Sequence, residues 1–264
     1  MKKIYGLIGR NIDYSFSAKY FSEKFKAEKI IDCEYKNFDL ARIEDFNNLE
    51  ISKINGLNVT IPYKEKIIPY LDKIDKSASE IGAVNTIAKK NNKLIGYNTD
   101  YLGFTNSFKN NLNFNNALIL GTGGASKAIQ YALNIKKINF DIASRQKNIK
   151  YKSYKKINES LNEYDLIINT TPIGTYPNIS EKPKLNYSLL SEKHFCYDLI
   201  YNPKKSSFLI ECEKKGAKTI NGLEMLQSQA EESWKIWNSM SLSLIHISEP
   251  TRQEAISYAV FCLK

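Results

Sequence analysis

A glycine-rich segment in the middle of the chain has the residue types and spacing that hold a dinucleotide. The segment Gly121-Thr122-Gly123-Gly124-Ala125-Ser126 follows the short apolar run 117–120 and precedes an apolar helical pattern over 128–133. Glycines let the chain turn tightly and bring backbone N–H groups against a pyrophosphate, and the following helix adds positive charge at its N-terminus. Ser126 stands where the dinucleotide fingerprint has its third glycine, so a glycine turn without a ligand remains an alternative.

The end of the next expected strand would select between the two nicotinamide cofactors. An acid about 20 residues beyond the glycine turn would bind the ribose hydroxyls of NAD. This chain has Ala143-Ser144-Arg145-Gln146-Lys147 there, and its acidic candidate, Asp141, comes before the strand end. A basic strand end without an acid suits the extra 2′-phosphate of NADP. The alternative is an exposed arginine without a role in binding.

A second group of polar residues stands at the ends of expected elements in the first half of the chain. The segments are Asn58-Val59-Thr60-Ile61-Pro62-Tyr63-Lys64, Asn85-Thr86 and Asn98-Thr99-Asp100, and Ser15 and Ser17 lie at the first strand–helix junction. Amides, hydroxyls, one cation and one carboxylate at such positions indicate a ligand site. Each residue alone has an ordinary explanation, namely turn formation, helix capping or a lysine on the surface.

Strands and helices are expected to alternate along the chain. Apolar runs predict strands at 3–8, 30–35, 57–60, 86–88, 94–97, 117–120, up to 143, 165–168 and 195–199. Helical spacing predicts helices over 18–25, after Asp100 through Phe104 and Phe108, over 128–133 and over 223–237. Asn91-Asn92 is typical of a hairpin turn. Apolar parallel strands separated by helices predict an α/β fold with a doubly wound sheet in the second half.

Length and composition place the chain among globular proteins. It has 264 residues, 42% of them hydrophobic and 25% charged, which excludes a disordered or low-complexity chain. The chain has no run of about 18 apolar residues, so no membrane span is expected. No apolar stretch follows Lys2 and Lys3, so no secretory signal is expected. The net charge of +10 comes from lysines spread over the chain, which indicates a solvated surface rather than a nucleic-acid interface.

The cysteines and histidines argue against disulfides and metal sites. Four cysteines stand far apart without a CxxC pair, which predicts reduced thiols in a cytoplasmic protein. With only two histidines, no metal site is expected.

Eight sequence blocks occur in an order and at a spacing that is far more specific than any single glycine motif. They are Gly6–Gly9 with Ser15–Ser17, Asn58–Lys64, Gly82–Thr86, Gly96–Asp100, the glycine turn, Asn169–Gly174, Tyr197–Pro203, and Asn221–Leu226 with Gln229. Together they resemble the shikimate dehydrogenase family over nearly the whole chain, from Ile4 to about Trp237.

The resemblance implies an oxidoreductase that catalyses the NADP-dependent, reversible reduction of 3-dehydroshikimate to shikimate, in the route to chorismate and aromatic amino acids. It implies that Lys64 is the catalytic residue and is paired with Asp100. The chemistry agrees with this, since hydride transfer requires a group that exchanges the hydroxyl proton. The substrate carboxylate and hydroxyls would contact Ser15, Ser17, Thr60, Asn85, Asp100, Tyr201 and Gln229. NADP would contact the glycine turn, Ser144, Arg145 and Gln146, with Leu199 and Gly222 near the nicotinamide.

The resemblance also implies two domains with the active site in the cleft between them. An N-terminal α/β substrate domain would span 1–102 and a Rossmann-type, doubly wound NADP-binding domain 103–222. The pattern of strands and helices itself predicts the junction near 101–115, with the polar segment 110–116 as the linker. Residues 223–240 would form a helix that returns to the substrate domain.

The chain departs from the family pattern at two places. Tyr14 and Ala18 replace the His and Pro of the usual His-Ser-x-Ser-Pro block. Residues 241–264 do not resemble the final helix of the family; they read as adaptor or vector sequence, or as an ordinary divergent terminus.

Three other functions remain open at this point. They are a quinate/shikimate dehydrogenase that uses NAD, a catalytically silent sensor that binds shikimate-like ligands, and a nucleic-acid-binding module. The expected partner is a small-molecule substrate, with no nucleic acid and no membrane, and the expected state is a monomer or homodimer.

Overall fold

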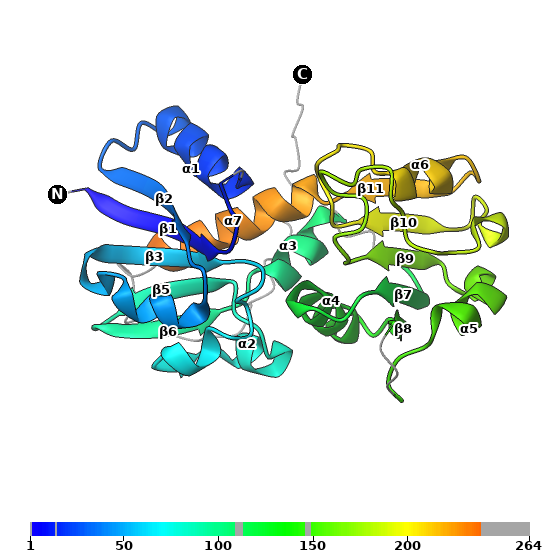
Figure 1. Ribbon diagram of the computed structural model, residues 1–264, viewed down its shortest axis with the longest axis horizontal. Helices are drawn as coiled ribbons and strands as arrows, with labels where there is room; N and C mark the ends of the chain where they lie inside the picture. The colour runs from blue at the N-terminus through cyan, green and yellow to red at the C-terminus, as the bar shows by residue number, and fades with distance from the viewer. Residues whose placement is uncertain (1, 14, 109–112, 146–148, 239–264) are drawn as a thin grey trace, which may run out of the picture.

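The computed structural model describes residues 2–13, 15–108, 113–145 and 149–238. The expectations for Tyr14, Gln146 and the segment 241–264 therefore lie outside the described residues. The described chain forms two β-sheets with helices on both faces, and these lie side by side in Figure 1, the first in blue to cyan and the second in green to yellow. The α/β fold class expected from the sequence is confirmed.

The first sheet has six strands in the order β2-β1-β3-β5-β6-β4. Their bounds are β1 Lys3–Gly9, β2 Cys33–Asp39, β3 Ile54–Val59, β4 Lys73–Ile74, β5 Thr86–Lys90 and β6 Lys93–Tyr97. Among them β5 runs antiparallel to its neighbours, and the other pairs are parallel. The expected hairpin is confirmed, because Asn91 and Asn92 join β5 to β6 with positive φ values of 48° and 58°.

The second sheet has five parallel strands in the order β11-β10-β9-β7-β8. Their bounds are β7 Asn116–Leu120, β8 Asn139–Ala143, β9 Leu166–Asn169, β10 Phe195–Asp198 and β11 Lys218–Asn221. The direction of strand succession reverses between β7 and β9. In open α/β sheets this is where the strand ends leave a crevice for a ligand.

Seven α-helices cover the two sheets in the described residues. They are α1 Phe16–Ala27, α2 Lys76–Ile81, α3 Asp100–Ser107, α4 Gly124–Ile135, α5 Tyr154–Glu159, α6 Ser207–Glu213 and α7 Leu223–Asn238. Helix α7, orange in Figure 1, packs against α3 and reaches the first sheet, so it contacts both halves of the molecule.

Alternating side chains divide the second sheet into two apolar faces. Leu118 and Leu120 of β7 face the cluster that holds α6, whereas Ala117 and Ile119 face the cluster of Phe104 and α4. The first sheet is likewise packed on both faces. Strands buried on both faces explain the continuous apolar runs in the sequence.

The expected strand at 30–35 is wrong at its start, since β2 begins at Cys33. Helix α1 ends at Ala27, Lys29 adopts φ = 56°, and the N–H of Ile30 donates to the carbonyl of Phe25. This closure uses the residues that look like a strand start, and it leaves Ile31 87% exposed. In the part of the chain described, no helix has the length and apolar character that a membrane crossing requires.

Candidate active site

The polar segments of the first half meet at one edge of the first sheet. The parallel strands β1, β3 and β6 end at this edge, and the antiparallel strand β5 begins there. The residues that follow or precede these ends therefore gather, although they are far apart in the sequence. Strand topology thus explains why Ser15, Thr60, Asn85 and Asp100 share one site.

A cavity of about 290 Å³ opens at this edge. All eight residues that the resemblance assigns to substrate or catalysis line it: Ser15, Ser17, Thr60, Lys64, Asn85, Asp100, Tyr201 and Gln229. The seven other lining residues are Leu7, Asn11, Ile12, Phe16, Asn58, Val59 and Leu226. A cavity lined by both polar and apolar side chains is typical of a site for a small polar molecule.

Lys64 and Asp100 form an ion pair at the wall of this cavity. Lys64 Nζ donates to Asp100 Oδ2 over 2.6 Å. The side chain of Lys64 is 16% exposed and that of Asp100 is 7% exposed. The amine is therefore accessible from the cavity, whereas the carboxylate is held behind it.

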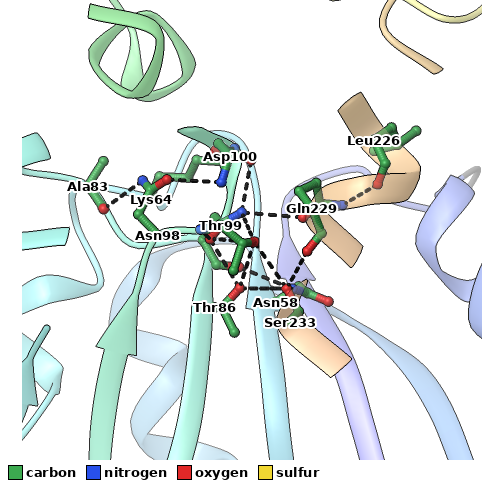
Figure 2. Close-up of polar contacts among 11 residues, drawn as sticks. Asn58, Lys64, Ala83, Thr86, Asn98, Thr99, Asp100, Leu226, Gln229 and Ser233 are labelled. Atoms are coloured by element: carbon green, nitrogen blue, oxygen red, sulfur yellow. Dashed lines mark hydrogen bonds and ion pairs between the residues drawn. The ribbon is translucent and has the colours of Figure 1, made fainter. Parts of the chain in front are cut away.

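Amide side chains fix the Asp100 carboxylate from the other side (Figure 2). Asn85 Nδ2 donates to Asp100 Oδ1 over 2.8 Å, and the backbone N–H of Asp100 donates to Asn98 Oδ1. Asn98 Nδ2 in turn donates to the carbonyl of Ala83. Asn85 Nδ2 also lies 3.3 Å from Gln229 Oε1, which brings α7 into the same network. Both carboxylate oxygens are thus hydrogen-bonded and Asp100 has a fixed orientation.

The two serines lie at the N-terminus of α1. Ser15 is the N-cap and its Oγ accepts the backbone N–H of Ser17 over 3.2 Å. The first turn of this 12-residue helix carries no acidic residue. The positive end of a helix dipole and two hydroxyl groups together favour an anionic group such as a carboxylate at this end of the cavity.

The glycine turn connects β7 to α4, as the sequence predicts. Gly121 has φ = +110°, and a Cβ there would lie 2.8 Å from Thr170 Oγ1 after β9. A Cβ at Gly123 would meet no described atom within 4 Å, and α4 starts without a side-chain cap. Uncapped backbone N–H groups beside open space fit a pyrophosphate. Ser126 is buried and donates to the Gly121 carbonyl, so its hydroxyl closes the turn.

The basic strand end follows β8 as expected. Asp141 lies inside β8 and accepts hydrogen bonds from Lys152 and Tyr164, so it is committed to the protein. Arg145 is exposed, and its charge opposes the rise that burial causes in the pKa of Tyr154. Ser144 is buried and its N–H donates to the Lys152 carbonyl.

Two further residues assigned to the cofactor are direct neighbours. A Cβ on Gly222 would lie 2.0 Å from the Leu199 carbonyl oxygen. Only glycine therefore allows the backbone after β11 to pass this close to the backbone after β10. Behind Leu199, Asp198 is fully buried and accepts from Ser206, Asn169 and the N–H of Ile200. Burial nevertheless raises the pKa of Asp198 to about 6.

The two halves of the site touch each other. A Cβ on Gly124 would lie 3.2 Å from Lys64 Cβ, so the glycine turn adjoins the ion pair. On the other side, the ring of Phe16 meets that of Tyr201 edge to face, with centroids 5.3 Å apart. Burial raises the pKa of Tyr201, and a hydrogen bond to the backbone of Phe16 opposes the rise.

Sequence reasoning missed several residues of this site. Asn58 was part of a recognised block without a role, and Phe16 was only the residue between two serines. Leu226 likewise lay in a block without an assignment. A signal existed for Asn58, since Asn58 and Thr60 alternate along one strand end and so share a face. No comparable signal marked Phe16.

Comparison with known proteins identifies the relatives of this chain. Residues 7–87 match the shikimate dehydrogenase substrate binding domain. A shikimate dehydrogenase (NADP(+)) of Clostridium beijerinckii is 39% identical over 257 residues, which cover 91% of this chain and 93% of the relative. The chain belongs to the shikimate dehydrogenase family.

Solved structures of shikimate dehydrogenases have the same architecture. One in complex with NADP+ is 37% identical, has a TM-score of 0.81, and the match covers 90% of each chain. The Thermus thermophilus enzyme in complex with NADP(H) and shikimate is 27% identical with a TM-score of 0.80, covering 90% of this chain and 94% of that one. The family resemblance inferred from the eight blocks is therefore confirmed.

Proposed function

We propose that this chain catalyses the NADP-dependent interconversion of 3-dehydroshikimate and shikimate. The observation that carries the proposal is the single cavity in which the Lys64–Asp100 pair, the two serines at the start of α1 and Gln229 of α7 meet. The glycine turn lies beside Lys64, so a nicotinamide held by the second sheet would reach the same cavity.

The residues around the glycine turn would hold NADP. Gly121 to Ser126 offer backbone N–H groups to the pyrophosphate, and Ser144 and Arg145, with Gln146 beyond them, would meet the 2′-phosphate. Leu199 and Gly222 would flank the nicotinamide, because they lie together at the ends of β10 and β11. When bound, the reduced cofactor supplies the hydride to the carbonyl carbon of the substrate.

The chain itself would supply the proton and the orientation. Lys64 Nζ would give a proton to the carbonyl oxygen during reduction and take it back from the hydroxyl during oxidation. Asp100 would orient Lys64, since its carboxylate is fixed by Asn85 and by the turn at Asn98. Ser15 and Ser17 would bind the carboxylate, while Thr60, Asn85, Tyr201 and Gln229 would meet the ring hydroxyls.

The two sheets support a division into a substrate domain over 1–102 and a cofactor domain over 103–222. Helix α7 would return to the substrate domain, as its contacts with β3 and β5 indicate.

The test is an assay of the purified chain with shikimate and NADP+, following reduction of the cofactor. Parallel assays with quinate and with NAD+ serve as comparisons. Turnover of shikimate with NADP+ at the highest kcat/KM supports the proposal. A preference for NAD+ with quinate, or binding of shikimate without turnover, would refute it.

A further inference from the structure

Two fully buried hydroxyl groups meet next to the cavity without lining it. Thr86 Oγ1 at the start of β5 lies 2.7 Å from Ser233 Oγ of α7 (Figure 2). Both residues are 0% exposed, and neither is among the residues that line the cavity. We infer that this hydroxyl pair positions Gln229 for the substrate, because it holds α7 against the first sheet one turn beyond Gln229. The inference rests on the function proposed above.

The direction of the hydrogen bond between the two hydroxyls follows from their other partners. Ser233 Oγ lies 2.9 Å from the carbonyl oxygen of Gln229, which can only accept, so Ser233 donates its single proton there. Asn58 Nδ2, which can only donate, gives a hydrogen bond to Ser233 Oγ over 2.9 Å. Two oxygens 2.7 Å apart need a proton between them, so Thr86 donates to the remaining lone pair of Ser233.

The hydroxyl of Ser233 thus attaches α7 to two neighbouring strands. Asn58 in β3 stands opposite Thr86 in β5 in the antiparallel register. Asn58 is itself fixed, because its Oδ1 accepts the hydroxyl of Tyr35 over 2.8 Å. The ring of Tyr35 stacks on the fully buried ring of Phe21, with centroids 4.5 Å apart and planes 13° apart. Ser233 therefore meets two donors whose positions are set by the first sheet.

Gln229 depends on this attachment because its own side-chain bonds hold it only loosely to the sheet. Its Nε2 donates to the carbonyl of Leu226 over 2.8 Å, within α7. Its Oε1 lies 3.3 Å from Asn85 Nδ2, which has a nearer acceptor in Asp100 Oδ1 at 2.8 Å. The helix that carries Gln229 therefore largely determines where its side chain lies. Ser233 is four residues further along the same face, so its bonds to the sheet fix that position.

The ion pair of the site does not depend on the hydroxyl pair. The backbone N–H of Thr99 donates to Asn85 Oδ1 over 2.7 Å, so the amide turns its Nδ2 towards Asp100. Thr99 Oγ1 accepts from the same Nδ2 over 2.9 Å. These contacts remain when Thr86 or Ser233 loses its hydroxyl. The proposed role therefore predicts an effect on substrate binding without an effect on proton transfer.

The experiment measures steady-state kinetics with shikimate for wild type, Thr86→Val, Ser233→Ala and the double variant. Valine keeps the shape of threonine, and in Thr86→Val the Ser233 hydroxyl still has Asn58 as a donor, so it is not left unsatisfied. For the loss of one hydrogen bond, we expect the KM for shikimate to rise about three- to tenfold, with kcat and the KM for NADP+ changed less than about twofold. Because both substitutions remove the same bond, the double variant should raise KM by less than the product of the two single effects.

Two further variants serve as controls. Thr86→Ser keeps the hydroxyl, so its KM should stay within about twofold of wild type. Ser228→Ala is the matched control on the same helix, because Ser228 Oγ accepts from Asn106 Nδ2 of α3 over 3.0 Å and is not among the cavity-lining residues. It removes a hydrogen bond between α7 and another element and should leave KM and kcat unchanged. A purely structural role of the pair would lower the melting temperature of Thr86→Val without changing KM.

Several outcomes would overturn the inference. Thr86→Val could show the wild-type KM, or lower kcat as much as kcat/KM. Thr86→Ser or Ser228→Ala could raise KM as much as Thr86→Val, or the effects in the double variant could multiply. If Thr86→Val does not fold, Ser233→Ala provides the same test; if neither folds, the pair is needed for the fold and the inference is wrong. Absence of turnover by wild type would instead refute the proposed function, and this inference with it.

Discussion

Replacing Lys64 by Met tests the central assignment, because it removes the amine while keeping much of the side-chain volume. If Lys64 exchanges the proton with substrate, kcat should fall by about 10²–10⁴-fold, the range for general acid–base catalysis. That range corresponds to about 3–5 kcal/mol of barrier. A charge-assisted hydrogen bond to bound substrate contributes only about 1.5–3 kcal/mol. If Lys64 contributed only to substrate binding, its loss would therefore appear mainly in KM.

The structure also indicates how far the substitution should destabilise the fold. Asp100 would lose its cation but would keep the hydrogen bond from Asn85, and water can reach it through the cavity that Lys64 lines. We therefore expect a loss of about 1–3 kcal/mol in the free energy of unfolding, below that for breaking a fully buried ion pair. A domain with a typical free energy of unfolding, about 5–15 kcal/mol, remains folded after such a loss.

The assay compares kcat for shikimate oxidation with the dissociation constant of shikimate measured by calorimetry. The matched control is Lys66→Met, since Lys66 is exposed and is not among the cavity-lining residues. A Lys64→Met enzyme that keeps kcat within tenfold of wild type, with weaker shikimate binding, would show that Lys64 only binds the substrate. The acid–base reasoning would then be wrong.

Three further predictions concern the second sheet. Arg145→Ala should raise the KM for NADP+ about tenfold or more while changing that for NAD+ little, because it removes a charge-assisted bond to the 2′-phosphate; an equal change with both cofactors contradicts this. Because burial raises the folded pKa of Asp198 to about 6, folding takes up a proton between about pH 4 and 6, and stability falls by up to about 3 kcal/mol as pH rises through that window. The free energy of unfolding, measured in urea at both ends of this pH window, should differ less between the two pH values in Asp198→Asn than in wild type. An equal pH difference in both proteins would contradict the assignment. Gly123→Ala should leave the melting temperature unchanged but raise the KM for NADP+. Gly222→Ala should lower the melting temperature, since its Cβ would meet the Leu199 carbonyl. Equal melting temperatures of wild type and Gly222→Ala would show that the backbone shifts to accommodate the Cβ.

The sequence predicted those parts of the site that short contiguous segments carry. The glycine turn, the Lys64 block and the Asn98–Asp100 block each combine a strand end with polar side chains, and parallel strands bring such ends together. Tyr35 could not be found in this way. It lies inside a strand, in no recognised block, and the hydrogen bond from its hydroxyl to the cavity-lining Asn58 depends on β1 lying between β2 and β3. Register and strand order are tertiary properties that local patterns do not contain.

Helix α7 shows the same distinction within one element. Its periodicity predicted a helix over 223–237, and the structure has Leu223–Asn238. Periodicity did not reveal that Gln229 and Ser233, one turn apart, would share the buried polar face towards Asn85 and Asn58. That face is set by the crossing with α3, where a Cβ on Gly103 would lie 2.6 Å from the Met225 carbonyl. Because α7 starts beside Leu199 and ends against the first sheet, this close crossing fixes both ends of the site with one rigid element.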